Sequence, residues 1–506
     1  MTDDYIVETT NGKVQGYARR GIIKFKGIPY AASPIGELRF KPPAPVEPWA
    51  GVREALDYGP ISPQPQGALE AMAGAEERPQ NEDGCLTLNV WTSSLGDEKR
   101  PVLFFIHGGG FTTGTGASLD GSRLVSRGDV VVVSINYRLG VLGFLYMPDT
   151  PDTTANAGVL DMVAALEFVR DNVANFGGDP NNVTIFGESA GGFAVTSLLA
   201  TPSAKGLFHR AIPQSGAAHA LGFNADAGRE VRDRLIKKLG VEKGDVSALR
   251  AIPAEDMIKA QIAISEQSQG EFGTGRPLSL GPVVDKSVIY AHPLDAVRDG
   301  YAKDIDLLVG SNLNETKLWV MLNPSPVELD EEGVSRGIGS MVRLAGNNEQ
   351  KTKELLEAYR KERKTPRDMM DAASTDYMFR IPSIRLAEAQ SRHQKNTYMY
   401  LFAWKSPMLG GKFGAMHALE LYFVFSILLP KEIGMIPKRT EETQALSEAM
   451  MDTWISFARN GDPNNESIPQ LPGYEPEKRA TIVFDNNITI ANDPYGHERA
   501  AWDDVI

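Results

Sequence analysis

The sequence predicts an α/β fold in which a mostly parallel central sheet is covered by helices on both faces. Short runs rich in Val, Ile and Phe, such as "PVLFFI" at 101–106 and "DVVVVSI" at 129–135, are typical of strands buried on both sides. An amphipathic, helix-like segment follows at 156–177, and parallel strands need such crossover segments. The strands end in glycine-rich turns, and ligands of such sheets bind beyond the carboxyl ends of the strands.

One large domain is favoured over several small ones, because no internal repeat or long low-complexity linker divides the chain. The chain has 506 residues, of which 42% are hydrophobic, so it can bury a large core. We expect a single domain over 1–506 with a helical insertion at about 320–395, because that segment is rich in Glu, Lys and Arg. The stretch at 63–80 is expected to form a polar loop.

Charge and apolar patterning exclude several classes of protein. The formal net charge of −13 disfavours a nucleic-acid partner, because phosphates would be repelled. Every apolar stretch is far shorter than the roughly 20 residues that span a bilayer. The beginning "MTDDYIVETT" lacks the basic and apolar regions of a secretory signal. With Cys85 as the single cysteine, expected to be a small buried residue, a cytoplasmic location is predicted.

A candidate nucleophile lies in "VTIFGESAGG" at 183–192. Gly187, Ser189 and Gly191 form a Gly-x-Ser-x-Gly pattern between an apolar strand and a helix-forming segment. Small flanking residues at such an elbow let the serine adopt strained dihedral angles that expose its hydroxyl. The alternative is a glycine-rich turn in which Ser189 only caps the following helix.

A second motif, "HGGGF" at 107–111, supplies candidate oxyanion donors. Acyl transfer develops negative charge on the carbonyl oxygen, and preorganised N–H groups stabilise it. Glycines let the backbone approach a substrate closely, so the N–H groups of Gly109 and Gly110 are expected to act with that of Ala190. The alternative is a plain glycine turn.

A serine nucleophile needs a base and an acid, which follow it in the order acid, then histidine, in this architecture. Six histidines follow Ser189: His209, His219, His292, His393, His417 and His497. His417 is favoured because it lies on a loop between glycines and an apolar run. Glu315, on a loop after the apolar strand "DIDLLVG", is the favoured acid and Asp285 the alternative. The acid would orient the imidazole and stabilise its protonated form.

Nearly the whole chain resembles the type-B carboxylesterases of the α/β-hydrolase fold, which include bacterial para-nitrobenzyl esterases and the cholinesterases. The matching segments are "FKGIPYAASPIGELRFKPP", "NEDGCLTLNVW", "HGGGF", "INYRLGVLGFL", "FGGDPNNVTIFGESAGG", "FHRAIPQSG", "LLVGSNLNET", "MHALELYFVF" and "WISFARNGDPN".

Position by position, the resemblance implies a triad of Ser189, Glu315 and His417 with oxyanion donors Gly109, Gly110 and Ala190. It further implies supporting roles behind the triad for Ser215 and Glu188. Structural ion pairs are implied between Arg39 and Glu82 and between Arg138 and Asp161. The family's mechanism requires no metal and no organic cofactor.

Three features depart from the family pattern. Asn314 and Thr316 replace the outer residues of a usual Asp-Glu-Gly run around Glu315. Cys85 has no upstream partner, so the disulfide of secreted relatives cannot form. The 62–84 loop lacks an aromatic residue, which makes acetylcholine a poor substrate expectation.

We therefore expect a serine carboxylesterase that hydrolyses small neutral esters through an acyl-enzyme. The three glycines at 108–110 suggest, by analogy with the family, tolerance of tertiary-alcohol esters. A monomer or weak homo-oligomer without a membrane span is expected. The alternatives are a lipase-like interfacial esterase and a non-catalytic, cholinesterase-like binding protein.

Overall fold

A computed structural model of the chain describes residues 5–66, 78–218, 224–270, 280–322, 329–431 and 434–506. The chain forms two compact units. The first comprises Met1–Ala211 and Gly222–Ala296, and the second comprises Ile212–Leu221 and Val297–Ile506. The predicted 63–80 loop lies largely outside the described residues. Among the described residues, no helix has the length and apolarity that a membrane span needs.

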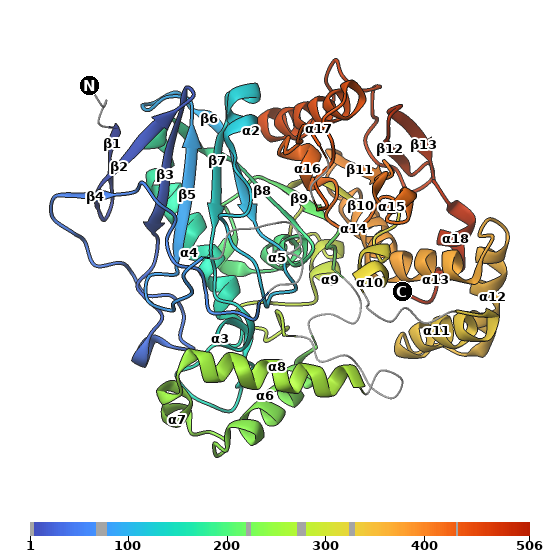
Figure 1. The fold of residues 1–506 in the computed structure, drawn as a ribbon, viewed down its shortest axis with the longest axis horizontal. Coiled ribbons are helices and arrows are strands. Elements are labelled where there is room, and N and C mark those ends of the chain that lie inside the picture. Colours follow the sequence, from blue (N-terminus) through green and yellow to red (C-terminus); the bar gives the residue numbers. More distant parts are fainter. Residues whose placement is uncertain (1–4, 67–77, 219–223, 271–279, 323–328, 432–433) are drawn as a thin grey trace. The chain divides into compact units, whose positions relative to one another are not determined.

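The first unit is built on a twisted mixed sheet with strand order β1-β2-β3-β5-β7-β6-β8, and β4 pairs with β2 (Figure 1). Its strands are β1 (Tyr5–Thr9), β2 (Gly12–Arg19), β3 (Ile22–Pro29), β4 (Val52–Glu54), β5 (Thr87–Thr92), β6 (Arg100–Ile106), β7 (Val131–Ile135) and β8 (Gly178–Glu188). The strand β9 (Arg210–Gln214) contains the point at which the chain passes to the second unit.

The N-terminal strands of this sheet are antiparallel, which the prediction of a mostly parallel sheet did not include. Strands β1 and β2 are separated by two residues, as are β2 and β3, and both pairs are antiparallel. A two-residue connection can only form a hairpin, because a parallel pair needs a long crossover. The pairs β6–β7 and β6–β8 are parallel as expected.

Helices cover this sheet and extend beyond it. They are α2 (Ser122–Gly128), α3 (Gly140–Phe144), α4 (Ala157–Asn172), α5 (Ala190–Leu199), α6 (Ala225–Leu239), α7 (Val246–Ala251), α8 (Ala254–Gly270) and α9 (Pro293–Arg298). Helices α4 and α5 pack on β8, and α2 packs on β5 and β7. In Figure 1 the green helices α6, α7 and α8 form a separate group, in which α6 and α8 contact each other.

The second unit contains a parallel trio of strands with one antiparallel edge. Strands β10 (Asp306–Asn312), β11 (Thr397–Phe402) and β12 (Ala480–Phe484) are parallel, and β13 (Thr489–Asn492) pairs antiparallel with β12. Long helical excursions connect the parallel strands, as this topology requires. The loop after β10 carries Glu315, the acid that the sequence predicts.

Helices fill most of the remaining second unit. They are α10 (Lys317–Leu322), α11 (Glu331–Leu344), α12 (Glu349–Arg360), α13 (Pro366–Thr375), α14 (Ile381–Gln390), α15 (Met408–Gly411), α16 (Leu421–Val424), α17 (Glu441–Asn460) and α18 (Gly496–Ala501). A π-helical turn, Asp376–Arg380, joins α13 to α14. Helices α10–α14 cover the range predicted as an insertion, and the grouping of 1–506 as a single domain remains a prediction.

Candidate active site

Ser189 lies at a sharp turn between β8 and α5. Its backbone has φ 57° and ψ −122°, which is a strained conformation for a residue with a side chain. The side chain makes no capping hydrogen bond to α5, so the alternative in which Ser189 only caps the helix is not supported. The hydroxyl is held at the N-terminus of α5, where the helix dipole favours negative charge.

The glycines of the motif are explained by the close approach of β6. A Cβ on Gly187 would lie 2.5 Å from the carbonyl oxygen of Ile106, and one on Gly191 would lie 2.1 Å from the same atom. Both contacts are far inside van der Waals distance, so neither position can hold a larger residue without moving the strand. The glycines are therefore needed both for the packing of β6 against the elbow and for the backbone angles of the elbow.

The "HGGGF" turn abuts the elbow directly. A Cβ on Gly108 would lie 3.2 Å from Cβ of Ser189 and 2.6 Å from the carbonyl oxygen of Glu188. Gly109 and Gly110 have φ of +105° and +62°, so the turn uses backbone conformations that favour glycine. The turn that provides the expected oxyanion donors is thus a direct neighbour of Ser189.

His107 supports this turn as a neutral side chain. Its Nδ1 donates to the carbonyl oxygen of Gly108 at 2.8 Å, and its ring stacks on Tyr137 with centroids 4.4 Å apart. Burial lowers the pKa of His107 to about 4, so it stays uncharged at neutral pH. His107 is the first residue of the "HGGGF" motif, and the sequence alone does not predict this supporting role.

Gly109→Ala is expected to lower kcat by about 10²–10³-fold, the usual effect of losing one oxyanion donor. A Cβ at this position would lie 2.3 Å from the carbonyl oxygen of Thr113, so the turn must move. Gly96→Ala is the matched control, because Gly96 has a similar φ of +104° with no atom within 4 Å of its added Cβ. Ester-hydrolysis kinetics at saturating substrate measure the effect, and equal rates in both variants would contradict it.

Glu315 and His417 form a buried pair in the second unit. Nδ1 of His417 donates to Oε2 of Glu315 at 2.6 Å, across 102 positions of sequence. Glu315 is 0% exposed and His417 is 3% exposed. Because the carboxylate fixes the proton on Nδ1, the Nε2 atom of the ring is left as the basic nitrogen.

Asn312, at the end of β10, binds Glu315 and the two residues Met416 and Glu420 that flank His417 in the sequence, and the sequence did not single it out. Its backbone N–H donates to Oε1 of Glu315 at 2.7 Å. Its side-chain amide donates to the carbonyl oxygen of Met416 at 2.7 Å and to Oε2 of Glu420 at 2.6 Å. Both carboxylate oxygens of Glu315 are therefore engaged, which fixes the orientation of the acid.

Two aromatic rings pack against the imidazole of His417. The ring centroids of Trp319 and Phe379 lie 4.8 Å and 5.0 Å from that of His417, and the two aromatic rings are themselves parallel. Trp319 is 42% exposed despite this packing. In the sequence, Trp319 lies four residues after Glu315, and this closeness is the one signal of its position near the acid.

The structure describes the two parts of the expected triad separately. Ser189 with Gly109, Gly110 and Ala190 belongs to the first unit, whereas Glu315 and His417 belong to the second. The contacts within each part come from the hydrogen bonds and glycine packing given above. The assembly of the two parts into one catalytic site is taken up as a proposal below.

The other candidate acids and bases are bound in local structure. Asp285 accepts hydrogen bonds from the backbone N–H groups of Ser287, Val288 and Ile289, so it serves a turn. His209 accepts from the N–H of Val183, and His393 bonds the carbonyl oxygen of Arg298. His292 precedes α9, and His219 lies outside the described residues.

The expected structural and supporting residues are placed as follows. Arg39 forms a bidentate ion pair with Glu82, and Arg138 forms one with Asp161; all four side chains are buried. Ser215 is buried after β9, and its N–H donates to the carbonyl oxygen of Gly310 on the strand that leads to Glu315. Glu188 is buried at the end of β8, and Cys85 is buried as a free thiol.

A buried carboxylate, Asp371 on α13, lies beside the loop that carries Glu315. The hydroxyl of Thr316 donates to the carbonyl oxygen of Asp371 at 3.0 Å, which attaches this loop to α13. Burial raises the pKa of Asp371 to about 6, and the positive charges of Arg367 and Lys317 only partly oppose this shift. Folding therefore favours the protonated form of Asp371, whereas above about pH 6 the carboxylate is ionised at a cost to stability.

Asp371→Asn is expected to stabilise the protein at neutral pH and to have little effect in acid. The folded pKa of Asp371 is raised, so its favourable contribution is complete below the unfolded value and is lost as pH rises through about 6. The stability difference between variant and wild type should grow by on the order of 1–3 kcal/mol between about pH 4 and about pH 7.5.

Denaturant unfolding at the two pH values measures this difference, with Asp304→Asn as the control because Asp304 is exposed. A difference that stays constant with pH would contradict the assignment to Asp371.

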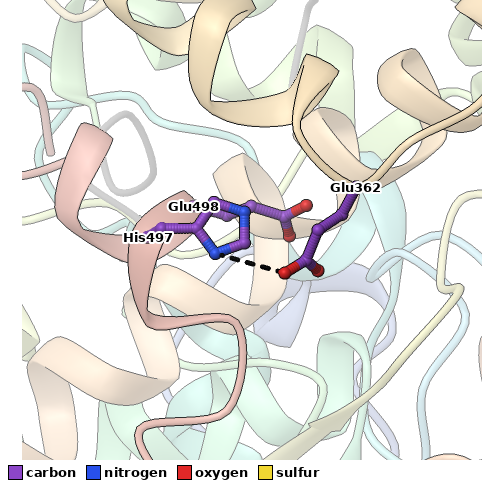
Figure 2. A group of neighbouring side chains, drawn as sticks. All are labelled: Glu362, His497 and Glu498. Atoms are coloured by element: carbon purple, nitrogen blue, oxygen red, sulfur yellow. Dashed lines mark ion pairs between the residues drawn. The ribbon is translucent and has the colours of Figure 1, made fainter.

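Figure 2 shows a second group of ionisable side chains, Glu362, His497 and Glu498, in the second unit. Nδ1 of His497 lies 3.6 Å from Oε1 of Glu362. The buried carboxylate of Glu498 already accepts two hydrogen bonds from Arg363, each at 2.7 Å. Because Arg363 already donates to both oxygens of Glu498 and balances its charge, we assign this cluster to structural ion pairing.

Comparison with known proteins gives relatives that cover nearly the full length of the chain. The chain matches the Carboxylesterase family over residues 3–502. It is 37% identical over 501 residues to the para-nitrobenzyl esterase of Bacillus subtilis (strain 168), covering 98% of this chain and 97% of that protein. It is 32% identical over 498 residues to the phenmedipham hydrolase of Pseudarthrobacter oxydans, covering 96% of this chain and 97% of that protein.

A solved structure of a thermophilic pNB esterase is similar, with a TM-score of 0.87 at 35% identity, covering 98% of this chain and 99% of that one. Coverage of nearly the full length by both sequence and structure shows a shared α/β-hydrolase fold and a shared class of chemistry. The chain is a carboxylic ester hydrolase and belongs to the carboxylesterase family.

Proposed function

We propose that this esterase uses Ser189 as nucleophile, His417 as general base and Glu315 as the orienting acid. The observation that carries the proposal is the buried hydrogen bond of 2.6 Å between Glu315 and His417. A neutral imidazole bonded in this way presents Nε2 as a proton acceptor, which is what a serine hydroxyl needs to become a nucleophile. Ser189, which is strained and makes no capping hydrogen bond, is the residue suited to give its hydroxyl proton to Nε2.

The reaction proceeds in two steps. Ser189 attacks the ester carbonyl while His417 accepts the hydroxyl proton, and the N–H groups of Gly109, Gly110 and Ala190 stabilise the oxyanion. His417 then returns the proton to the departing alcohol, leaving an acyl group on Ser189. Water attacks the acyl-enzyme with His417 again as base, and this releases the acid and restores the enzyme.

Small neutral esters with an aromatic alcohol are the substrate class that we propose. His417 protonates the leaving alcohol in this mechanism, so groups that contact its ring lie near that part of the substrate. The exposed indole of Trp319 and the ring of Phe379 give this neighbourhood an aromatic surface, on which an aromatic alcohol can stack. The relative named para-nitrobenzyl esterase supports the same class.

Labelling with a fluorescent organophosphonate tests the proposed nucleophile. The reagent reacts with activated serines, so the wild-type protein should become fluorescent and peptide mapping should locate the adduct on Ser189. Preincubation with a p-nitrobenzyl ester should slow labelling, because substrate occupies the same serine. An unlabelled protein that still hydrolyses the ester, or an adduct on another residue, would refute the assignment of Ser189.

A further inference from the structure

Asn314 joins the loop that carries Glu315 to the loop that carries His417. Its backbone N–H donates to the carbonyl oxygen of Ala415 at 2.9 Å. Its side-chain Oδ1 accepts from the N–H of the same Ala415 at 3.1 Å. Asn314 thus pairs with both the N–H and the C=O of Ala415, which lies two positions before His417. The two hydrogen bonds resemble those between paired strands.

The contact is also tight on the other side. A Cβ on Gly414 would lie 2.4 Å from Oδ1 of Asn314, and Gly414 has φ of +57°. Only glycine therefore leaves room for the amide at its observed place without a shift of the loop. The neighbouring hydrogen bond from the N–H of His417 to the carbonyl oxygen of Glu315, at 3.3 Å, continues the same ladder between the two loops.

We propose that Asn314 is a positioning residue that sets the separation of Glu315 and His417. Because its amide is neutral, Glu315 is the single carboxylate on the loop between β10 and α10. The effect on catalysis rests on the proposed function, whereas the effect on the Glu315–His417 hydrogen bond does not.

The absence of charge on Asn314 matters because carboxylates already lie close to His417. Glu315 contacts the imidazole directly. Glu420, three residues after His417, accepts hydrogen bonds from Asn312 and Gln214. On α13, Asp371 lies beside Thr316 and interacts electrostatically with Arg367, with Asp368 and with Lys317 of α10. A second carboxylate next to Glu315 would stabilise the imidazolium further and make His417 a base only at higher pH.

Three variants separate the hydrogen bond from the charge. Asn314→Ala removes the acceptor for Ala415, Asn314→Asp keeps an acceptor and adds a negative charge, and Asn487→Asp adds the same charge at an exposed surface position. Steady-state kinetics from about pH 5 to 9 give kcat, KM and the acid limb of kcat/KM. Proton NMR of the Nδ1–H in the Glu315–His417 bond gives a readout that does not depend on turnover.

We expect Asn314→Ala to lower kcat by about 10–100-fold with KM nearly unchanged, because a misplaced base costs turnover rather than binding. Its Nδ1–H resonance should weaken or move upfield. Asn314→Asp should keep kcat within about threefold, but its acid limb should move to higher pH by about 0.5–1 unit. Asn487→Asp should match the wild type in both measurements.

The proposal is overturned if Asn314→Ala keeps the wild-type kcat and Nδ1–H resonance, or if Asn314→Asp leaves the acid limb unshifted. Should Asn314→Ala fail to fold, Gly414→Ala replaces it, because its added Cβ displaces Oδ1 of Asn314 from the other side. Retained resonance and kcat in Gly414→Ala would then overturn the proposal. Failure of Ser189 labelling together with loss of the resonance would refute the proposed function and leave the role of Asn314 standing.

Discussion

Replacing Ser189 by alanine is expected to lower kcat for ester hydrolysis by about 10⁴–10⁶-fold while leaving the protein folded. The hydroxyl is the atom that attacks the carbonyl, and no other group of the elbow can form the acyl-enzyme. The side chain makes no capping hydrogen bond to α5, so its loss should change the stability by less than about 1 kcal/mol. Stopped-flow or steady-state assay of p-nitrophenyl esters, with thermal unfolding of the same sample, measures both quantities.

Ser203→Ala is the matched control, because Ser203 is an exposed serine in the turn that follows the same helix. It should retain wild-type kcat and KM. Activity of Ser189→Ala within tenfold of the wild type would show that the nucleophile lies elsewhere. The residual rate of a correctly assigned variant comes from the oxyanion donors and binding alone, so it should still exceed the rate in water.

Glu315→Gln is expected to lower kcat by about 10³–10⁴-fold with little change in KM. The carboxylate accepts the Nδ1 proton of His417, whereas a glutamine amide can donate to Nδ1 and so favour the tautomer with the proton on Nε2. That tautomer cannot accept the proton of a serine hydroxyl. The shape of the side chain is kept, so substrate binding should be preserved.

The exposed Glu332→Gln serves as control for the loss of one negative charge, because Glu332 pairs only with Arg336 on the surface of α11 among the described contacts. It should leave kcat unchanged. If Glu315→Gln instead raises KM with an unaltered kcat, Glu315 acts in binding rather than in orienting the base.

The strands and helices of the catalytic core could be predicted from the sequence because their patterns are local. The apolar run before Ser189 and the small residues around it predict an elbow, and the structure shows that Gly187 and Gly191 face the carbonyl oxygen of Ile106. The antiparallel N-terminal hairpins were missed although their two-residue connections were visible in the sequence. Attention to turn length would have found them.

Contacts between distant loops could not be predicted in the same way. Glu315 and His417 were chosen by chain order and loop context, and the structure places them in hydrogen-bond contact. The roles of Asn312 and Asn314 depend on the register between two loops about a hundred residues apart, which no periodicity records. Trp319 and Phe379 likewise meet His417 only through the packing of α10 and the π-helical turn.

The most direct test of the central claim is to trap the acyl-enzyme. Acid quenching of the wild-type protein during turnover of p-nitrophenyl acetate, followed by digestion and peptide mass mapping, locates any acyl group that the reaction leaves on the chain. The proposed mechanism predicts one acetyl group on the peptide that contains Ser189, and its absence from Ser189→Ala. Product formation with no acetylated Ser189, or with the acyl group on a different residue, would contradict it.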